Sequence, residues 1–574
     1  MANVTINGIK VTVPDHATIL QAAEAAGVKV PTLCYHPDQA IKANCRICVC
    51  EVEGLALLQA ACSTPVWDGM VVKTNSPAVL EARKTILELI LAHHPQDCLN
   101  CIRNQNCELQ SLAEAYQIRE NPFEHMTRGL PKDRSTPSLV RDPDKCVLCR
   151  RCEYACSQFQ SVNALGMENR GHHAMVVPSL GKDLLESPCV MCGQCIHACP
   201  VGAIHENEQI DEFLAAVADP EKIVVTQMAP AVRLAIGEEV GLATGDMDMH
   251  VLVGALKQIG FDYVLHTNFT ADLTIIEEGH ELLKRVKEGG KLPMFTSCSP
   301  GWINFCETYY PDLLDNLSTC KSPQQMFGAL VKTYWAEKMQ VDPAKIYSVS
   351  IMPCTAKKFE ASRPEMNDSG YRDVDLVLTT RELGRLFRMA GLDFSKVVPG
   401  SFDSWMGAYT GAAVIFGATG GVMEAALRTV YEVVTGKTLA DVNFTFARGM
   451  DGIKEAEIDL NGLKVKVAIA HGLANARQVM DQVRAGTSPY HFIEIMACPG
   501  GCIGGGGQPI TKSNVKRAER IKAIYVEDEK LPLRKSHDNP EVQQLYKEFL
   551  HEPLGHKSHE LLHTHYTPKN KKFF

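Results

Sequence analysis

The chain has 574 residues and a formal net charge of −9, and its residues are 45% hydrophobic and 22% charged, a composition typical of a water-soluble protein with several domains. The mildly acidic balance argues against nucleic acid as a partner. The first residues lack the basic and apolar segments of a signal peptide, and apolar runs such as residues 85–92 are too short to span a bilayer. We therefore expect a cytoplasmic protein with no membrane partner.

Cysteine is unusually abundant, with 22 residues, of which sixteen lie before residue 200. A reducing compartment disfavours disulfides, so clustered thiols at short spacing indicate bound metal. The uneven distribution predicts a cysteine-dense N-terminal third followed by an ordinary α/β enzyme domain.

The first predicted domain, residues 1–78, opens with two alternating runs around Asn7-Gly8, which predict a β-hairpin. A helical pattern that ends at Gly27 follows. Four thiols then come close enough in sequence to enclose a small cluster: Cys34, Cys45, Cys48 and Cys62. This order resembles the plant-type ferredoxin fold with its 2Fe-2S cluster, in the form found in respiratory complex I and iron-only hydrogenases. Cys50 is left over, and we expect it to be buried.

The second predicted module, residues 79–125, carries the spacing H-x3-C-x2-C-x5-C. Its members are His94, Cys98, Cys101 and Cys107. Imidazole and thiolate both ligate iron, and the pattern is similar to a 4Fe-4S module of the same two families. Two alternatives remain: His93 is the ligand instead, or His94 only caps a helix.

The third predicted domain, residues 126–209, contains the spacing C-x2-C-x2-C-x3-C twice, which is the pattern of bacterial two-cluster ferredoxins. The first run is Cys146, Cys149, Cys152 and Cys156, and the second is Cys189, Cys192, Cys195 and Cys199. In that pattern the fourth cysteine of each run ligates the other cluster. A row of clusters carries single electrons between a surface and a buried site, and the long region that follows argues against a free-standing electron carrier.

Residues 210–574 change character. Apolar runs at 222–230, 346–354, 464–472 and 491–501 predict buried strands, and the helical patterns between them predict parallel sheets covered on both faces. Sites in such sheets lie at the carboxyl ends of strands. We therefore expect Cys354 and Cys498 to converge there, joined by Cys502 from a glycine-rich loop.

A second glycine-rich stretch, Gly417 to Arg428, resembles a phosphate-binding turn. The chain has neither a G-x-G-x-x-G fingerprint nor a Walker A run. We expect no nucleotide or flavin site, so any nicotinamide chemistry requires another subunit.

Three loops carry a more specific resemblance: FTSCSPGW, IMPCTAKKFE and EIMACPGGCIGGGGQP. They resemble the signature loops of iron-only (FeFe) hydrogenases, in the same order, and the resemblance covers essentially the whole chain. That family interconverts H₂ with protons and electrons at the H-cluster, a 4Fe-4S cubane bridged to a two-iron unit with CO, cyanide and a dithiolate. The resemblance implies an α/β catalytic domain preceded by a β-grasp ferredoxin-like domain, a His/Cys₃ module and a two-cluster ferredoxin-like domain. It also implies one 2Fe-2S cluster and three accessory 4Fe-4S clusters.

The resemblance assigns three cubane ligands, Cys354, Cys498 and Cys502, with Cys502 as the bridging thiolate. It makes Lys357 a hydrogen-bond donor to a cyanide ligand. It also implies a set of neighbours of the two-iron unit: Ala229, Pro230 and Gln324 beside the diatomic ligands, and Met352, Met496 and Phe416 as an apolar wall. For the methionines, plain core packing is the alternative.

The resemblance further implies a proton relay that starts at the thiol of Cys298. Its remaining members are Glu278, Ser318, Glu281 and Arg285. Three of these are spaced i, i+3 and i+7 on one predicted helix and can share a face. An exposed stripe of ion pairs is the alternative.

Two positions depart from the family pattern. Ala231 stands where a serine is usual. Ser299 stands where the family has the fourth cubane cysteine, and a serine hydroxyl is a harder, more basic donor that ligates iron poorly. Three alternatives follow: Ser299 ligates as an alkoxide and lowers the cluster potential, Cys298 takes its place as ligand, or the cubane is labile and the enzyme impaired.

The C-terminal segment contains His559 and His563 at a metal-binding spacing of i, i+4, with no acidic or thiol partner nearby in sequence. We expect Cys306 and Cys320 to be core thiols.

The favoured function is a hydrogenase that takes electrons from ferredoxin or another one-electron carrier and depends on maturation proteins for its H-cluster. One alternative is the hydrogenase subunit of an NAD(P)-linked, flavin-containing complex, because residues 536–566 are similar to such subunits. An alternative of another class, motivated by Ser299, is a non-catalytic iron–sulfur sensor or electron conduit.

Overall fold

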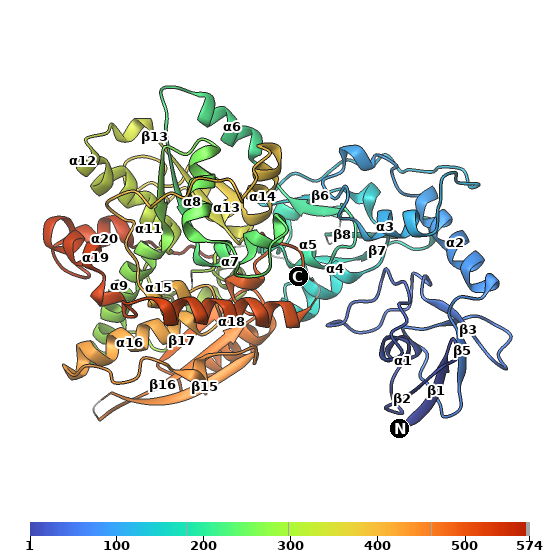
Figure 1. The fold of residues 1–574 in the computed structure, drawn as a ribbon. Helices are drawn as coiled ribbons and strands as arrows, with labels where there is room; N and C mark the ends of the chain where they lie inside the picture. Colours follow the sequence, from blue (N-terminus) through green and yellow to red (C-terminus); the bar gives the residue numbers. More distant parts are fainter. Residues whose placement is uncertain (179–180, 297, 461, 512, 570–574) are drawn as a thin grey trace.

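A computed structural model describes residues 1–178, 181–296, 298–460, 462–511 and 513–569. Among them, no helix combines the length and the apolar character that crossing a bilayer demands. Figure 1 shows the N-terminal sheet at the lower right, the ferredoxin-like segment in teal beside it, and a larger α/β lobe at the left.

The N-terminal sheet has the strand order β2-β1-β5-β3-β4. Its strands are β1 (Ala2–Ile6), β2 (Ile9–Val13), β3 (Val49–Val52), β4 (Gln59–Ala60) and β5 (Val71–Lys73). Asn7 and Gly8 both have positive φ, as a two-residue hairpin turn requires, and β1 pairs antiparallel with β2 as predicted. Helix α1 (Ile19–Ala25) begins at a capping box made by Thr18 and Gln21.

The cysteine-rich modules that follow are built from short elements. The helices are α2 (Pro77–Ala92), α3 (Glu108–Ala115), α4 (Arg151–Tyr154) and α5 (Gln194–Ala198), and the strands are β6 (Leu139–Arg141), β7 (Leu165–Glu168), β8 (Met175–Pro178) and β9 (Ile204–Glu206). Strands β6 and β9 pair antiparallel, as do β7 and β8. This pairing brings the two ends of the ferredoxin-like segment together.

The larger lobe contains two four-stranded sheets. The first has the order β11-β10-β13-β14 and is parallel throughout, and the second has the order β12-β17-β16-β15. Their strands are β10 (Ile223–Met228), β11 (Tyr263–His266), β12 (Met294–Thr296), β13 (Ile346–Met352), β14 (Leu376–Thr379), β15 (Ile453–Leu460), β16 (Leu463–His471) and β17 (Phe492–Met496). All four predicted strands are present, and the prediction of parallel sheets is confirmed apart from the antiparallel edge strand β15.

Helices cover both sheets (Figure 1). They are α6 (Ile210–Ala218), α7 (Pro230–Glu239), α8 (Met249–Gln258), α9 (Thr267–Glu288), α10 (Pro300–Tyr309), α11 (Pro323–Leu330), α12 (Ala336–Met339), α13 (Ala356–Ala361), α14 (Thr380–Met389), α15 (Gly411–Ile415), α16 (Gly421–Thr435), α17 (Leu473–Arg484), α18 (Asn514–Lys530), α19 (Pro540–Leu545) and α20 (His556–Leu562). The long helix α9 packs against α11, α15 and α16. Most of its residues are therefore buried, including Glu278 and Glu281 of the predicted relay face, whereas Arg285 is half-buried.

The phosphate-like turn at Gly417 to Arg428 is filled by the protein itself. The carboxylate of Glu494 accepts hydrogen bonds from the backbone N–H groups of Gly420 (2.6 Å) and Met423 (2.7 Å) at the start of α16. An internal carboxylate thus occupies the helix N-terminus that would otherwise attract an anion. This turn is a structural cap.

Candidate functional site: an iron–sulfur chain leading to a buried cysteine pocket

The four cysteines of the N-terminal domain lie together. Cys34 is hydrogen-bonded to Cys45, and Cys48 to Cys62, while the charges of the other three thiols contribute to raising the pKa of Cys62. Cys34, Cys48 and Cys62 are buried. The leftover Cys50 is also buried, and its thiol donates to the carbonyl of Gln59 (3.4 Å), as expected for a packing residue.

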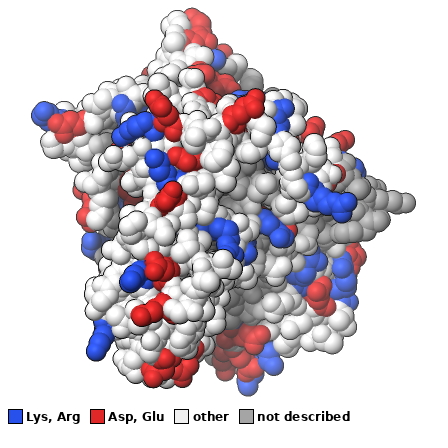
Figure 2. Space-filling view, turned by 90° about the vertical axis from the view of Figure 1, so that its right-hand side faces the viewer, with Lys and Arg blue, Asp and Glu red and all other residues white. Residues whose placement is uncertain are grey.

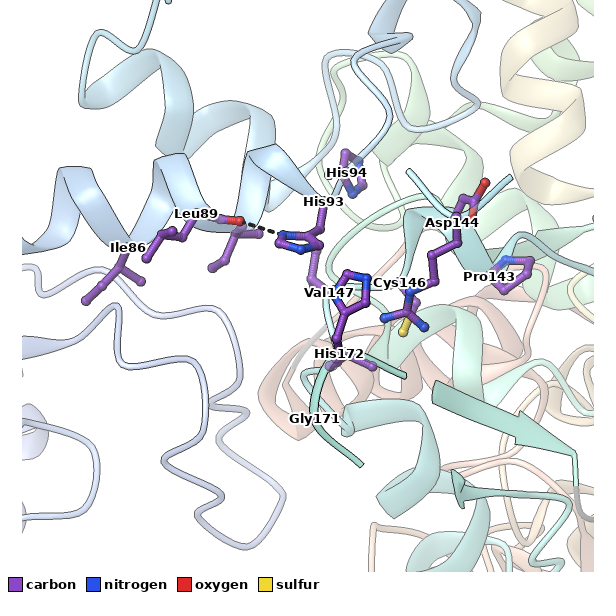
Figure 3. A pocket seen from close by; sticks show the side chains of 13 residues that line it. Ile86, Leu89, His93, His94, Pro143, Asp144, Cys146, Val147, Gly171 and His172 are labelled. Carbon is purple, nitrogen blue, oxygen red and sulfur yellow. Dashed lines mark hydrogen bonds between the residues drawn. The ribbon is translucent and has the colours of Figure 1, made fainter. Parts of the chain in front are cut away.

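Two adjacent histidines, His93 and His94, are candidate cluster ligands in the second module. His94 is buried, its Nδ1 meets no hydrogen-bond partner among the described residues, and burial lowers its pKa to about 4, so the imidazole is neutral and free to ligate. His93 is bonded through Nδ1 to the carbonyl of Leu89 (3.2 Å) and lies edge-on against His172, in a pocket that His94 also lines (Figure 3). The charge of Lys145 lowers the pKa of His94 further, and Lys145 is hydrogen-bonded to the predicted ligand Cys101. The geometry favours His94.

The two ferredoxin-like runs cross over in space. Burial raises the pKa of the Cys149 thiol most, and the charges of Cys199 and Cys146 raise it further. One cavity is lined by four cysteines together: Cys146, Cys149, Cys152 and Cys199. In the second run, burial and the neighbouring charges of Cys189 and Cys156 raise the pKa of Cys195. Cys199 of the second run therefore lies with the first run, and Cys156 of the first run lies near Cys195; the exchange of the fourth ligand stays a prediction.

The second cysteine run lies directly against the catalytic lobe. Gln194 donates to the carbonyl of Gly504 (2.8 Å), and His197 is bonded to the carbonyl of Gly505 (2.8 Å). The side chain of Gln194 also bonds to the thiol of Cys498, and the pKa of Cys192 is raised by burial and then by the charge of Cys498. The last accessory cluster position thus adjoins the predicted cubane.

A cavity of about 50 Å³ lies beside the carboxyl ends of strands from both sheets. It is lined by loops that follow the carboxyl ends of β10, β12 and β13, and by the glycine-rich loop after β17. Its walls include these predicted residues: Ala229, Pro230, Cys298, Gln324, Met352, Cys354, Lys357, Phe416 and Cys502. Met496 is buried in the core cluster that contains Phe416. Ala231 also lines the cavity, so a serine there would face into it.

Three thiols line this cavity, those of Cys298, Cys354 and Cys502, and Cys498 lies close enough for its charge to act on Cys354 and Cys502. Burial raises the pKa of Cys354 to about 12 and that of Cys498 to about 11. The hydrogen bond between Cys298 and Cys502 lowers the pKa of Cys298 and raises that of Cys502. Buried thiols stay protonated on their own, and a bound metal cation reverses that preference. Cys354, Cys498 and Cys502 thus lie near one another, and their role as cubane ligands stays a prediction.

Lys357 reaches the cavity from α13 and is held in place by two partners. Its Nζ lies 2.8 Å from Glu360 Oε2 and 2.7 Å from Ser322 Oγ. The same Glu360 oxygen accepts a hydrogen bond from Gln324 (3.0 Å). This network fixes a cationic donor and an amide at one wall of an otherwise apolar space, where polar contacts gain strength.

The predicted relay residues form one hydrogen-bonded chain. Glu278 is bonded to Ser318, whose Oγ donates to Glu281 Oε2 (2.9 Å), and Glu281 Oε1 pairs with Arg285 (2.6 Å). Glu278 and Glu281 are 4% and 7% exposed, so this face of α9 is buried and the alternative of an exposed ion-pair stripe is wrong. Burial raises the pKa of Glu278 to about 7, against hydrogen bonds from Thr296 and Ser318 that lower it.

Ser299 is buried and stands at the N-terminus of α10. The same turn packs against Cys192 of the ferredoxin-like segment and against Ala497 of the larger lobe, because a Cβ at Gly301 would lie 3.6 Å from Cys192 Cβ and 3.5 Å from Ala497 Cβ. Cys298, one residue earlier, lines the cavity with Lys357 and Phe416.

These donor sets fit iron–sulfur clusters: three groups of converging thiols, a neutral buried imidazole with a free nitrogen, and a fourth group of thiols beside an apolar cavity. Family models agree along the chain. Residues 222–506 match the iron only hydrogenase large subunit, C-terminal domain, and residues 514–569 match the iron hydrogenase small subunit. Three further models match the N-terminal part: a 2Fe-2S iron-sulfur cluster binding domain at 1–77, the NADH-ubiquinone oxidoreductase-G iron-sulfur binding region at 83–122, and a 4Fe-4S dicluster domain at 145–203.

Two known proteins align along the whole chain. The NADP-reducing hydrogenase subunit HndD of Solidesulfovibrio fructosivorans is 48% identical, with 100% of both chains covered. Iron hydrogenase 1 of Clostridium pasteurianum is 41% identical, with 99% of this chain and 100% of the relative covered. The chain belongs to the iron-only hydrogenase family. The solved [FeFe]-hydrogenase HydA1 from Chlamydomonas reinhardtii is similar as well, at 45% identity and a TM-score of 0.57, covering 63% of this chain and 99% of that one.

This iron-only hydrogenase is thus an oxidoreductase with 2Fe-2S and 4Fe-4S binding domains ahead of an H-cluster domain. The predicted fold class, enzyme class and cofactors are confirmed.

Several residues around the hydrogenase site escaped prediction. Thr296 donates to Glu278 (2.5 Å), and Glu360 and Ser322 hold Lys357. Thr296 belongs to the FTSCSPGW loop, where its position two residues before Cys298 was the available signal. Glu360 lies on α13 three residues after Lys357, at the end of the IMPCTAKKFE run, so its i, i+3 spacing was the available signal. Ser322 carries no local signal, because it lies 35 residues from Lys357 in the sequence and meets it only in the folded chain.

Replacing His94 by glutamine should remove one accessory cluster from the purified hydrogenase, because the amide is a poor iron ligand. We expect the iron content to fall by about four per chain, with the loss of one cluster signal in electron paramagnetic resonance. The matched His93→Gln variant should keep both. Loss of the cluster in His93→Gln and its retention in His94→Gln would reverse the assignment.

Proposed function

We propose that the hydrogenase moves protons between the surface and its H-cluster through Cys298 and the buried chain on α9. When bound, the H-cluster supplies the centre at which two protons and two electrons combine to H₂. The observation that carries the proposal is the continuous hydrogen-bonded chain beside the cysteine pocket. Its members, from the interior outward, are Glu278, Ser318, Glu281 and Arg285.

The charge properties of this chain suit proton transfer. A carboxyl with a pKa of about 7 exchanges protons in both directions near neutral pH, which is the condition for an efficient general acid and base. Arg285 lies at the outer end, where its guanidinium bonds to the carbonyl of Leu317 (2.7 Å) and to Glu281. The backbone N–H of Ser318 donates a hydrogen bond to the carbonyl of Phe295 (2.8 Å). Strand β12 therefore fixes the position of the Ser318 residue in the middle of the chain.

Replacing Glu278 by glutamine should lower H₂ evolution by about 100-fold or more, because the amide cannot transfer a proton. The cluster signals should not change. Loss of activity together with the clusters would instead mean that Glu278 supports the fold.

The variant Thr296→Val tests the role of Glu278 in proton exchange without removing its carboxyl group. The Thr296 hydroxyl stabilises the Glu278 carboxylate and so lowers its pKa. Its removal should raise that pKa by about one unit, so the pH at which Glu278 loses its proton, and with it the alkaline limb of the rate profile, should move upward. An unchanged profile in Thr296→Val would contradict the role of Glu278.

We assign Ser299 to the position of the fourth cubane ligand and keep Cys298 as the proton donor. Two contacts support this assignment. The turn that follows Ser299 packs against Cys192 and Ala497, on the side of the accessory cluster. Cys298 lines the cavity on the side of Lys357 and Phe416. An alkoxide donor at Ser299 would lower the potential of the cubane relative to a thiolate.

Exchanging donors at these two positions tests the assignment. Ser299→Cys should raise the midpoint potential of the cubane, measured by a redox titration followed by electron paramagnetic resonance. Ser348→Cys, at a buried serine near the other end of β13, is the matched control and should leave the potential unchanged. Cys298→Ser should abolish turnover and keep the cubane. Loss of the cubane in Cys298→Ser, with no effect of Ser299→Cys, would make Cys298 the ligand.

Electrons reach this site from the cysteine-rich end of the molecule. The cluster sites continue from the N-terminal sheet to the contacts of Gln194 and His197 with the glycine-rich loop. Basic and acidic side chains are interspersed on the face that this end presents (Figure 2). A carrier docking there would meet both signs of charge, which suits ferredoxin or a subunit surface.

A second candidate is a hydrogenase subunit of an NAD(P)-linked flavin-containing complex. It is favoured by the 48% identity to a subunit of an NADP-reducing hydrogenase. The start of α16, the one turn with a phosphate-binding appearance, is filled by Glu494. Nicotinamide chemistry would therefore be supplied by the other subunits.

The two candidates differ in what the chain does alone. Once matured by the dedicated assembly proteins, the single chain should evolve H₂ with reduced ferredoxin. It should evolve none with NADPH unless flavoprotein subunits are added. NADPH-dependent H₂ evolution by the single chain would show that it contains a nucleotide site after all.

A further inference from the structure

Three metal-ligating side chains from three distant segments meet beside α9. They are Glu281 on α9, Cys320 in the loop before α11, and His563 directly after α20. One ligand atom of each lies within 4.8 Å of the other two, and all three residues are buried. His563 showed a metal-binding spacing without a partner in the sequence, and the fold provides both a thiol and a carboxylate.

The backbone holds two of these ligands side by side. Cys320 and His563 form an antiparallel bridge, flanked by hydrogen bonds from Lys321 N to Leu562 O (2.8 Å) and from Thr564 N to Thr319 O (2.8 Å). The thiol and the imidazole therefore start from fixed positions, which lowers the entropic cost of binding a metal.

The third ligand is the carboxylate oxygen of the proposed proton relay. Glu281 Oε1 faces Arg285 at 2.6 Å, whereas Glu281 Oε2 faces Ser318 Oγ at 2.9 Å and Cys320 Sγ at 3.9 Å. A cation bound by the thiol would compete with Ser318 for Oε2, while Oε1 could keep Arg285. Binding would thus act on the bond between Ser318 and Glu281.

The surroundings favour a cation. Besides burial, the charges of Glu281, Glu278 and Glu277 raise the pKa of the Cys320 thiol. The same negative field attracts a divalent ion, which displaces the thiol proton to solvent as the metal–sulfur bond forms. The imidazole of His563 is held by Thr319 Oγ1 at Nδ1 (2.8 Å) and by Glu277 Oε2 at Nε2 (3.3 Å). One of these two contacts would be exchanged for the metal, and the other would orient the ring.

A route from solvent adjoins the site. His559 is exposed on α20, and its ring lies 4.3 Å from that of His563, centroid to centroid. An ion that first binds His559 therefore needs to move only a short distance inward. Thiolate, imidazole and carboxylate together are the donors that zinc and related ions prefer, with water as a fourth ligand.

We propose that Glu281, Cys320 and His563 form an inhibitory site for zinc-class divalent cations, and that the bound ion interrupts proton transfer by taking Glu281 Oε2 from Ser318. The binding part stands on the three ligands alone. The inhibitory part rests on the proposed proton relay.

The test uses the matured hydrogenase and zinc chloride, with H₂ evolution and metal location both measured. Zinc should inhibit reversibly, with recovery on adding a chelator and with unchanged cluster signals. Crystals soaked in zinc chloride should show anomalous scattering at the zinc edge between the three side chains. The zinc concentration for half inhibition should rise by about tenfold or more in Cys320→Ser and in His563→Gln, each compared with its own zinc-free rate. Cys306→Ser, at a buried thiol on α10, is the matched control and should keep the parent's sensitivity.

The outcomes separate the two parts. Zinc located elsewhere, or unchanged inhibition in both ligand variants, overturns the site whatever the relay does. Zinc bound between the three ligands with full H₂ evolution overturns the inhibitory role and removes Glu281 from the relay. The Glu278→Gln and Thr296→Val measurements judge the rest of the relay independently, because neither residue is a zinc ligand.

Discussion

The close packing of four consecutive glycines is the constraint on which the site depends. A Cβ at Gly504 would lie 2.1 Å from Pro499 O, one at Gly505 2.2 Å from Pro353 O, and one at Gly506 2.4 Å from Cys192 O. No side chain fits at these distances. None of the residues Gly504 to Gly507 has a positive φ. Glycine is therefore needed here because the backbone segments approach closely, and not because of a left-handed turn.

This packing couples electron delivery to the catalytic pocket. The loop brings Cys498 and Cys502 to the carboxyl ends of strands from both sheets. Its carbonyl groups are hydrogen-bonded to the side chains of Gln194 and His197 from the ferredoxin-like segment. Cys192 of the ferredoxin-like segment and Cys498 of the catalytic lobe thereby become neighbours. The proposed proton chain lies along α9, so in this proposal electrons and protons reach the pocket by separate routes.

Much of this arrangement follows from local patterns. Cysteine spacing predicts the accessory clusters because their ligands lie on short loops, and the apolar runs predict β10, β13, β16 and β17 because each is a buried strand of continuous hydrophobicity. The spacing of Glu278, Glu281 and Arg285 predicts a shared face. Whether that face is buried depends on α11 and α16, which no local pattern of α9 reveals. For the same reason the meeting of Cys320 with His563 could not be foreseen, since it requires the C-terminal segment to return across more than 240 residues of chain to pair with the loop before α11.

The central claim is that the cysteine loops around the buried cavity hold a bridged cubane and two-iron unit despite the serine at position 299. Infrared spectroscopy of the matured protein tests it most directly, because CO and cyanide ligands absorb where the protein does not. The account predicts sharp CO and cyanide bands from the purified chain, altered when H₂ is admitted. A matured protein that contains its accessory clusters but has no such bands would contradict it.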